Sequence, residues 1–127
     1  MANPLNTSTL VGMVESKPKF IRKQTGDFQI QFVLSVKREF QTEDGRYEYD
    51  HLLVHYTGNK NRINAAKLLK EGDAISVIGS VRSNRYNGQY ITFIECDDFS
   101  WIPKKQELFE KKVLPVSVNY AKKASYK

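Results

Sequence analysis

A strict alternation of apolar and polar residues between positions 28 and 36 constrains the fold of this chain more than any other feature. The apolar positions are Phe28, Ile30, Phe32, Leu34 and Val36. Five apolar residues at a period of two predict a β-strand with one face in a core and the other toward solvent. Val33 interrupts the polar set, so we expect a partner subunit to cover part of the outer face.

Two short turn sequences predict how this strand continues into a sheet. Asp44-Gly45 is expected to supply the positive-φ positions of a tight hairpin turn that leads into a strand over Tyr47–Thr57. Asn87-Gly88 predicts a second hairpin, between strands at Ala74–Asn84 and Gln89–Phe99. The apolar alternation of each strand ends at or before its turn.

The remaining segments predict one more strand, a loop and a helix. Residues 6–15 have the pattern of a strand bent at Gly12, and residues 16–26 are expected to form a loop. Residues 60–71 change to a helical period, with Ile63, Ala66 and Leu69 on one face and Leu68 alongside. Either Asn59 or Asn61 is expected to cap this helix, and Gly72 to end it.

The order of these elements predicts the fold class. Three strands, one short helix and a two-stranded hairpin are typical of an all-β protein built as a five-stranded oligonucleotide-binding (OB-fold) barrel. A single helix cannot cover a doubly wound sheet, so that class is excluded. We expect one domain over residues 1–103, followed by a short basic C-terminal tail, residues 104–127, that is partly disordered.

The charge distribution does not by itself indicate a partner. The chain of 127 residues has a formal net charge of +6, but residues 104–127 hold seven lysines against two glutamates. Residues 1–103 therefore carry thirteen basic and twelve acidic side chains. An argument for nucleic-acid binding has to rest on where the charges lie rather than on their sum.

Catalysis and metal binding are not expected. His51 and His55 are four residues apart on a predicted strand, about 13 Å, which is too far to share a metal ion. The adjacent Asp97 and Asp98 would point to opposite faces of a strand, and the single cysteine, Cys96, lacks a neighbouring base. No glycine-rich phosphate loop is present. We therefore predict no enzyme activity, no metal and no cofactor, and the absence of a signal sequence favours the cytoplasm.

The two predicted hairpins combine aromatic rings with basic side chains beyond the point where the core alternation ends. This combination is typical of proteins that bind single-stranded nucleic acid, in which bases stack on aromatic rings and cations follow the phosphates. A basic loop could guide the phosphate backbone as well. The residues concerned are Lys37, Arg38, Phe40, Arg46, Tyr47 and Tyr49 in one hairpin, Arg82, Arg85, Tyr86 and Tyr90 in the other, and Lys17, Lys19, Arg22 and Lys23 in the loop.

The alternative is that these rings only cover hydrophobic surface. Phe28, Phe32 and Phe93 are expected in the core, and Trp101 is expected to pack against the barrel. Tyr56 shares its face with Leu52 and Val54, so it is either a base platform or a residue of the barrel wall.

The chain resembles the bacterial and bacteriophage single-stranded DNA-binding proteins over about residues 5–103. Six fragments match the family's motifs in the right order and spacing, although each alone is weak. They are Asn6 with Leu10-Val11-Gly12, the segment Phe32–Phe40, the segment Tyr49–Val54, the segment Ala65–Asp73, the segment Ile78–Ser83 and the segment Gly88–Thr92.

This resemblance implies roles for particular residues and an assembly. Phe40 and Tyr86 match base-stacking positions, and Tyr49 and Tyr56 lie near two more, with His55 as the alternative to Tyr56. The family also implies a homotetramer, a dimer of dimers, often paired through the first strand. The basic end of the tail departs from the family's acidic partner-recruiting tip, which favours a bacteriophage- or plasmid-type member.

The sequence thus predicts non-catalytic, largely sequence-independent binding and protection of single-stranded DNA in replication, recombination or repair. The rival hypotheses are a primosome-type or strand-annealing adaptor that acts mainly through replication or recombination proteins, an RNA-binding protein and, more remotely, a nuclease. The predicted stacking residues are Phe40, Tyr49, Tyr56 and Tyr86. The predicted phosphate contacts are Lys19, Arg22, Lys37, Arg38, Arg46, Arg82 and Arg85.

Overall fold

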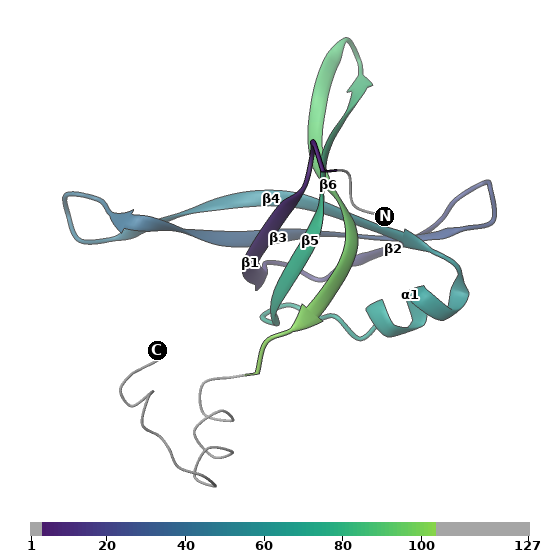
Figure 1. Cartoon of the computed structure of the whole chain (residues 1–127), viewed down its shortest axis with the longest axis horizontal. Coiled ribbons are helices and arrows are strands. Elements are labelled where there is room, and N and C mark those ends of the chain that lie inside the picture. The colour runs from purple at the N-terminus through teal and green to yellow at the C-terminus, as the bar shows by residue number, and fades with distance from the viewer. Residues whose placement is uncertain (1–3, 104–127) are drawn as a thin grey trace, which may run out of the picture.

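The structure, a computed structural model, describes residues 4–103 of the chain. It contains six strands and one helix, and the long strands cross one another in a twisted sheet (Figure 1). The elements are β1 (Ser8–Val14), β2 (Lys19–Arg22), β3 (Phe28–Gln41), β4 (Tyr47–Gly58), α1 (Lys60–Ala66), β5 (Ala74–Tyr86) and β6 (Gln89–Trp101). No helix in this part of the chain is long and apolar enough to span a bilayer.

Five of the strands close into a barrel. The ring runs β1–β5–β6–β4–β3 and returns to β1 through the pairs Met13↔Ser35 and Val14↔Leu34. All neighbours are antiparallel except β4 and β6, which pair in parallel at Val54↔Ile94 and His55↔Glu95. The predicted fold class, an all-β OB-fold barrel with one short helix, is confirmed.

The barrel core is formed by the alternating residues that the sequence predicted. Ile30, Phe32 and Leu34 of β3 face Val54 and Tyr56 of β4 in the interior. Gln29 is also buried, unlike a typical outward-facing polar residue. Its side-chain amide donates a hydrogen bond to Thr57 Oγ1 (3.0 Å), and its Oε1 accepts one from Gln31. These bonds satisfy the buried amide.

The segment predicted as a loop over residues 16–26 contains a short strand. β2 pairs along β3 from Lys19↔Gln31 to Arg22↔Phe28, and Gly26, at φ 96°, completes the turn between them. Phe20 stacks on Phe28 with ring centroids 5.3 Å apart. Four residues are too few to show a period-two pattern, so the sequence prediction missed this strand.

The two hairpin turns differ from each other. Asn87 (φ 49°) and Gly88 (φ 78°) both have positive φ, as the two-residue turn requires. At Asp44-Gly45 only Gly45 has positive φ (84°), and the N–H of Thr42 donates to the carbonyl of Arg46. The expectation that Asp44 also adopts positive φ is therefore wrong, because the loop is longer than two residues.

Helix α1 is shorter than the predicted segment 60–71. Asn59 is the cap, since its Oδ1 accepts a hydrogen bond from the N–H of Arg62 (3.0 Å). After Ala66 the N–H groups of Leu68 and Leu69 bond to carbonyls three residues back, which ends the α-helical pattern. Ile63, Ala66 and Leu69 are buried, whereas Leu68 is exposed.

Two β-hairpins extend from the barrel in different directions (Figure 1). We call residues 37–50 the β3–β4 arm and residues 82–92 the β5–β6 arm. Nearly all side chains of both arms are exposed, because neither arm has a second layer packed against it. The arms are therefore free to contact a partner.

Closure of the barrel depends on Gly12. A Cβ at this position would collide with the carbonyl oxygen of Ser35 on β3, where β1 changes partner from β5. We expect Gly12→Ala to lower the free energy of unfolding in urea by about 1–3 kcal/mol, the usual cost of overpacking. Gln41→Ala, at an exposed position of β3 outside the barrel, is the control and should change it by only about 0.5 kcal/mol. Equal stability of Gly12→Ala and wild type would contradict this account of closure.

Candidate nucleic-acid interface

A groove of about 470 Å³ lies between strand β4 and the β5–β6 arm. Parallel pairing of β4 with β6 brings the outward residues of β4 against the base of the arm. Because side chains alternate along a strand, Leu53 and His55 face this groove while Val54 and Tyr56 face the core. The lining residues are Leu53, His55, Asn84, Arg85, Tyr86, Ile91 and Phe93.

His55 and Phe93 form an aromatic pair in this groove. Their rings stack with centroids 4.2 Å apart and an interplanar angle of 23°. Burial, and secondarily the charge of Lys23, lowers the pKa of His55 below its ordinary value of 6.5. Its Nε2 is buried without a hydrogen-bond partner in the described residues, which also disfavours the protonated form. Burial in the groove thus favours the uncharged form of this imidazole at neutral pH.

The structure removes Tyr56 from the predicted stacking set. Its side chain is only 6% exposed, and its ring packs edge-on against Phe99 at 5.2 Å. Its hydroxyl accepts a hydrogen bond from Arg62 Nε (2.8 Å), and the guanidinium lies 4.6 Å from the ring centroid. Tyr56 is a barrel-wall residue that fastens α1 to β4, and His55, the alternative, occupies the outward position.

The β5–β6 arm combines an exposed ring with unpaired positive charge. Tyr86, 65% exposed, lies next to the turn and reaches the groove. The arm carries Arg82 and Arg85 and no acidic residue. Arg85 lies over the ring of Tyr90 at 5.5 Å, and neither arginine has an ion pair within the described chain. This arm is therefore an electropositive surface.

The β3–β4 arm carries the other predicted rings but a different charge. Phe40 is 77% exposed, and Tyr49 is also exposed. Arg38 forms ion pairs with Glu48 (3.0 Å) and Asp50 (2.8 Å), and its hydrogen bond to Asp50 lowers the pKa of that carboxyl group.

The predicted cations of this arm are thus largely engaged within it. Arg46 pairs with Asp44 at 2.7 Å, and Lys37 lies 3.9 Å from the ring centroid of Tyr47. With three basic and five acidic residues the arm is net negative. A phosphate would have to compete with these carboxylates for Arg38 and Arg46.

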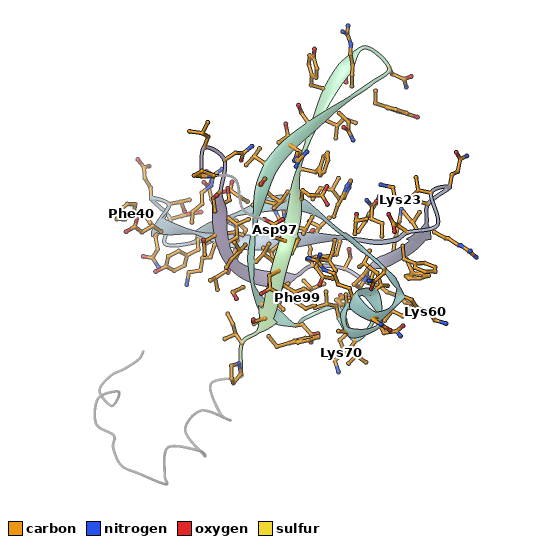
Figure 2. The ribbon with its side chains drawn as sticks, turned by 45° about the vertical axis from the view of Figure 1, so that its right-hand side comes forward. Lys23, Phe40, Lys60, Lys70, Asp97 and Phe99 are labelled. Atoms are coloured by element: carbon orange, nitrogen blue, oxygen red, sulfur yellow. The ribbon has the colours of Figure 1, made fainter. Side chains whose placement is uncertain are left out.

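The predicted site residues thus fall into three places. Tyr86 and Arg85 meet His55 in the groove, Phe40 and Tyr49 lie on the other arm, and Lys19 and Arg22 lie on β2. Figure 2 shows Phe40 and Lys23, of the β2–β3 turn, on opposite sides of the barrel. Phe93, Ile91 and Asn84 were not predicted as groove residues, because no sequence pattern shows that β4 and β6 pair in parallel.

The residues considered for catalysis do not come together in one site. His51 Nδ1 lies 2.5 Å from Glu15 Oε1, and burial raises the pKa of the Cys96 thiol to about 12. Within residues 4–103 no group of three or more histidine, cysteine, aspartate or glutamate side chains is placed to hold a metal ion.

A closed five-stranded barrel with one short helix and two exposed arms defines a protein of the OB-fold class. The chain belongs to the single-strand binding protein family, whose model matches residues 5–99. It is 28% identical over 107 residues to "Single-stranded DNA-binding protein 3" of Listeria innocua serovar 6a. That match covers 80% of this chain and 66% of the relative, slightly less than two thirds of its length.

Solved structures share this fold. The dimeric N-terminal domain of the PriB protein from Thermoanaerobacter tencongensis is 27% identical, with a TM-score of 0.59, and the match covers 79% of this chain and 99% of that one. The Plasmodium falciparum SSB in complex with ssDNA is 18% identical, with a TM-score of 0.67 and coverages of 81% and 99%. At that identity the second likeness shows the fold alone.

The lowered pKa of His55 predicts a pH dependence of stability. Since the unfolded chain binds this proton more readily than the folded protein, acid favours unfolding. The free energy of unfolding should fall as pH drops below 6.5 toward the lowered pKa. Urea unfolding across this range should show a smaller fall in His55→Gln, whereas the control His51→Gln should keep the contribution of His55. An NMR titration midpoint for His55 at or above 6.5 would contradict the prediction.

Proposed function

We propose that this protein binds and protects single-stranded DNA without catalysis. The observation that carries the proposal is the groove between β4 and the β5–β6 arm, where aromatic rings lie beside Arg85, which has no ion pair within the described residues. Membership of the single-strand binding protein family and the printed name of the Listeria relative support the choice of ligand.

The bases stack on rings in the groove and on the arms. Tyr86 and His55, which Phe93 supports from below, receive bases in the groove, and Phe40 and Tyr49 receive others on the β3–β4 arm. A neutral His55 favours this role, because a base can cover it without desolvating a charge. Stacking contributes about 1–3 kcal/mol per base and tolerates every base type.

The phosphates are held mainly by the β5–β6 arm. Arg82 and Arg85 are the principal contacts, with Lys37 at the base of the other arm. Leu53 and Ile91 in the groove offer no hydrogen-bonding groups to a base edge, which favours binding of any sequence. Release of counterions makes the affinity fall steeply with salt.

The proposal extends to the biological setting. A protein that covers unpaired bases fits the protection of single strands in replication, recombination and repair, in the cytoplasm of a bacterium or of a bacteriophage's host. No observation in residues 4–103 favours the adaptor hypothesis over strand binding. Residues 104–127, the predicted basic tail, lie outside the described residues.

Titration with oligothymidine tests the proposal. We expect saturable quenching of the tyrosine fluorescence by the single strand, weakened by salt, and little binding of a duplex of equal length. Tyr86→Leu should weaken binding by about 1–3 kcal/mol. Tyr56→Phe is the control: it should leave affinity unchanged and lower stability by about 1 kcal/mol, through loss of the bond from Arg62.

Three outcomes would overturn the assignment. Equal affinity for duplex would argue against stacking of bases. Tighter binding of the matched RNA strand would favour an RNA ligand. Strand affinity too weak to measure, together with tight protein partners, would favour the adaptor hypothesis.

We also propose that the protein is a homo-oligomer that pairs through β1. Val11 (56% exposed) and Met13 of β1 form an apolar surface with Ile78 of β5, because residues that alternate with the core positions share the outer face. The dimeric PriB neighbour supports an assembly of this fold. The family resemblance favours a tetramer built from two such dimers.

Charge on this face should dissociate the oligomer. We expect Val11→Glu combined with Met13→Glu to reduce the mass in sedimentation equilibrium to that of a smaller species, since like charges would face each other across the pair. Leu68→Glu, at an exposed apolar position outside this face, is the control and should keep the wild-type mass. A wild-type protein that is monomeric at all concentrations would refute the proposed pairing.

A further inference from the structure

A second surface with aromatic and basic character lies between β2 and α1. It surrounds a small groove of about 110 Å³ that no acidic side chain lines. We call it the β2–α1 face. Its lining residues are Lys17, Pro18, Lys19, Phe20, Ile30, Ala66, Lys67 and Leu69.

On this face, aromatic rings lie next to basic side chains. Phe20, 46% exposed, stacks on Phe28 with an interplanar angle of 19°. Lys67 Nζ lies 4.5 Å from the centroid of Phe20, and the Arg22 guanidinium lies 5.6 Å from that of Phe28. The arrangement has the two components that single-stranded nucleic acid requires, a ring and phosphate-binding cations.

The face is connected to the groove by a row of residues across three strands. Lys19 of β2 pairs with Gln31 of β3, which pairs with His55 of β4, so these three side chains lie side by side on the outer surface. Phe20 alternates with Lys19 and lies on the opposite face of β2, so the path from this row to Phe20 passes around the edge of the sheet. Lys23 in the β2–β3 turn is near enough for its charge to lower the pKa of His55. Positive charge therefore continues from the groove to β2.

We propose that the β2–α1 face binds the next segment of the same DNA strand, beyond the groove. This inference rests on the proposed function and extends it. A base stacks on the exposed part of Phe20 as the Lys67 ammonium moves from the ring to a phosphate. Lys17, Lys19 and Arg22 hold the neighbouring phosphates. The choice of ligand follows from charge complementarity, because the groove is lined by three lysines and no carboxylate.

The test compares short and long oligothymidines on the full chain. The short strand is the shortest one that saturates the fluorescence quench, and the long strand is twice that length. The test variant is Lys17→Gln with Lys67→Gln. The matched control is Lys60→Gln with Lys70→Gln, two lysines near α1 (Figure 2) that do not line the groove.

We expect the test variant to lose affinity for the long strand while keeping that for the short one. Loss of two phosphate contacts should make the slope of log K against log salt shallower by about 1.4 for the long strand. Phe20→Leu should weaken long-strand binding on the order of tenfold without changing that slope. The control variant should keep the wild-type slope, and thermal unfolding should show that all variants are folded.

Two results would overturn the inference. One is a test variant with wild-type affinity and slope for the long strand. The other is a test variant that keeps long-strand binding but loses binding of a poly-glutamate peptide, which would assign the face to an acidic protein partner. Failure of the wild-type protein to bind either strand would instead refute the proposed function, so the two failures are distinguishable.

Discussion

The structure depends on the double pairing of β1. This strand bonds to β5 along its length and to β3 at its end, and Gly12 permits the close approach to the Ser35 carbonyl that joins the two. Closure buries Val14, Leu34 and Val77 on one interior face. In the same ring of strands β4 lies beside β6, and these two strands pair in parallel. The groove depends on this pairing, because it is lined by residues of β4 and of the β5–β6 arm.

The two arms show how a similar composition gives different surfaces. Both have aromatic rings beside arginines, yet the β3–β4 arm directs Arg38 and Arg46 onto its own carboxylates. The β5–β6 arm has no carboxylate, so Arg82 and Arg85 keep their charge for a partner. This difference is the reason for proposing that both arms stack bases while one binds most of the phosphates. A phosphate-binding role for a surface arginine depends on its neighbours as much as on its place in the chain.

Much of the fold followed from local patterns in the sequence. The alternation from Phe28 to Val36 and the turn at Asn87-Gly88 are confirmed, because each depends on residues close together in the chain. β2 was missed because four residues cannot show a period. Helix α1 was predicted too long, because Leu68 and Leu69 continue an apolar pattern after the α-helical bonds have ended at Ala66.

The sequence by itself determined the five strands of the barrel, a helix capped by Asn59 or Asn61, the class of barrel and the presence of exposed rings on two hairpins. Only the tertiary structure decided between Tyr56 and His55, because adjacent residues on a strand face opposite sides and the core lies on one of them. Only the tertiary structure shows that Phe93 stacks on His55 and that the Lys67 ammonium lies over the ring of Phe20. These contacts link residues on separate elements, and spacing along the chain cannot show which elements become neighbours when a barrel closes.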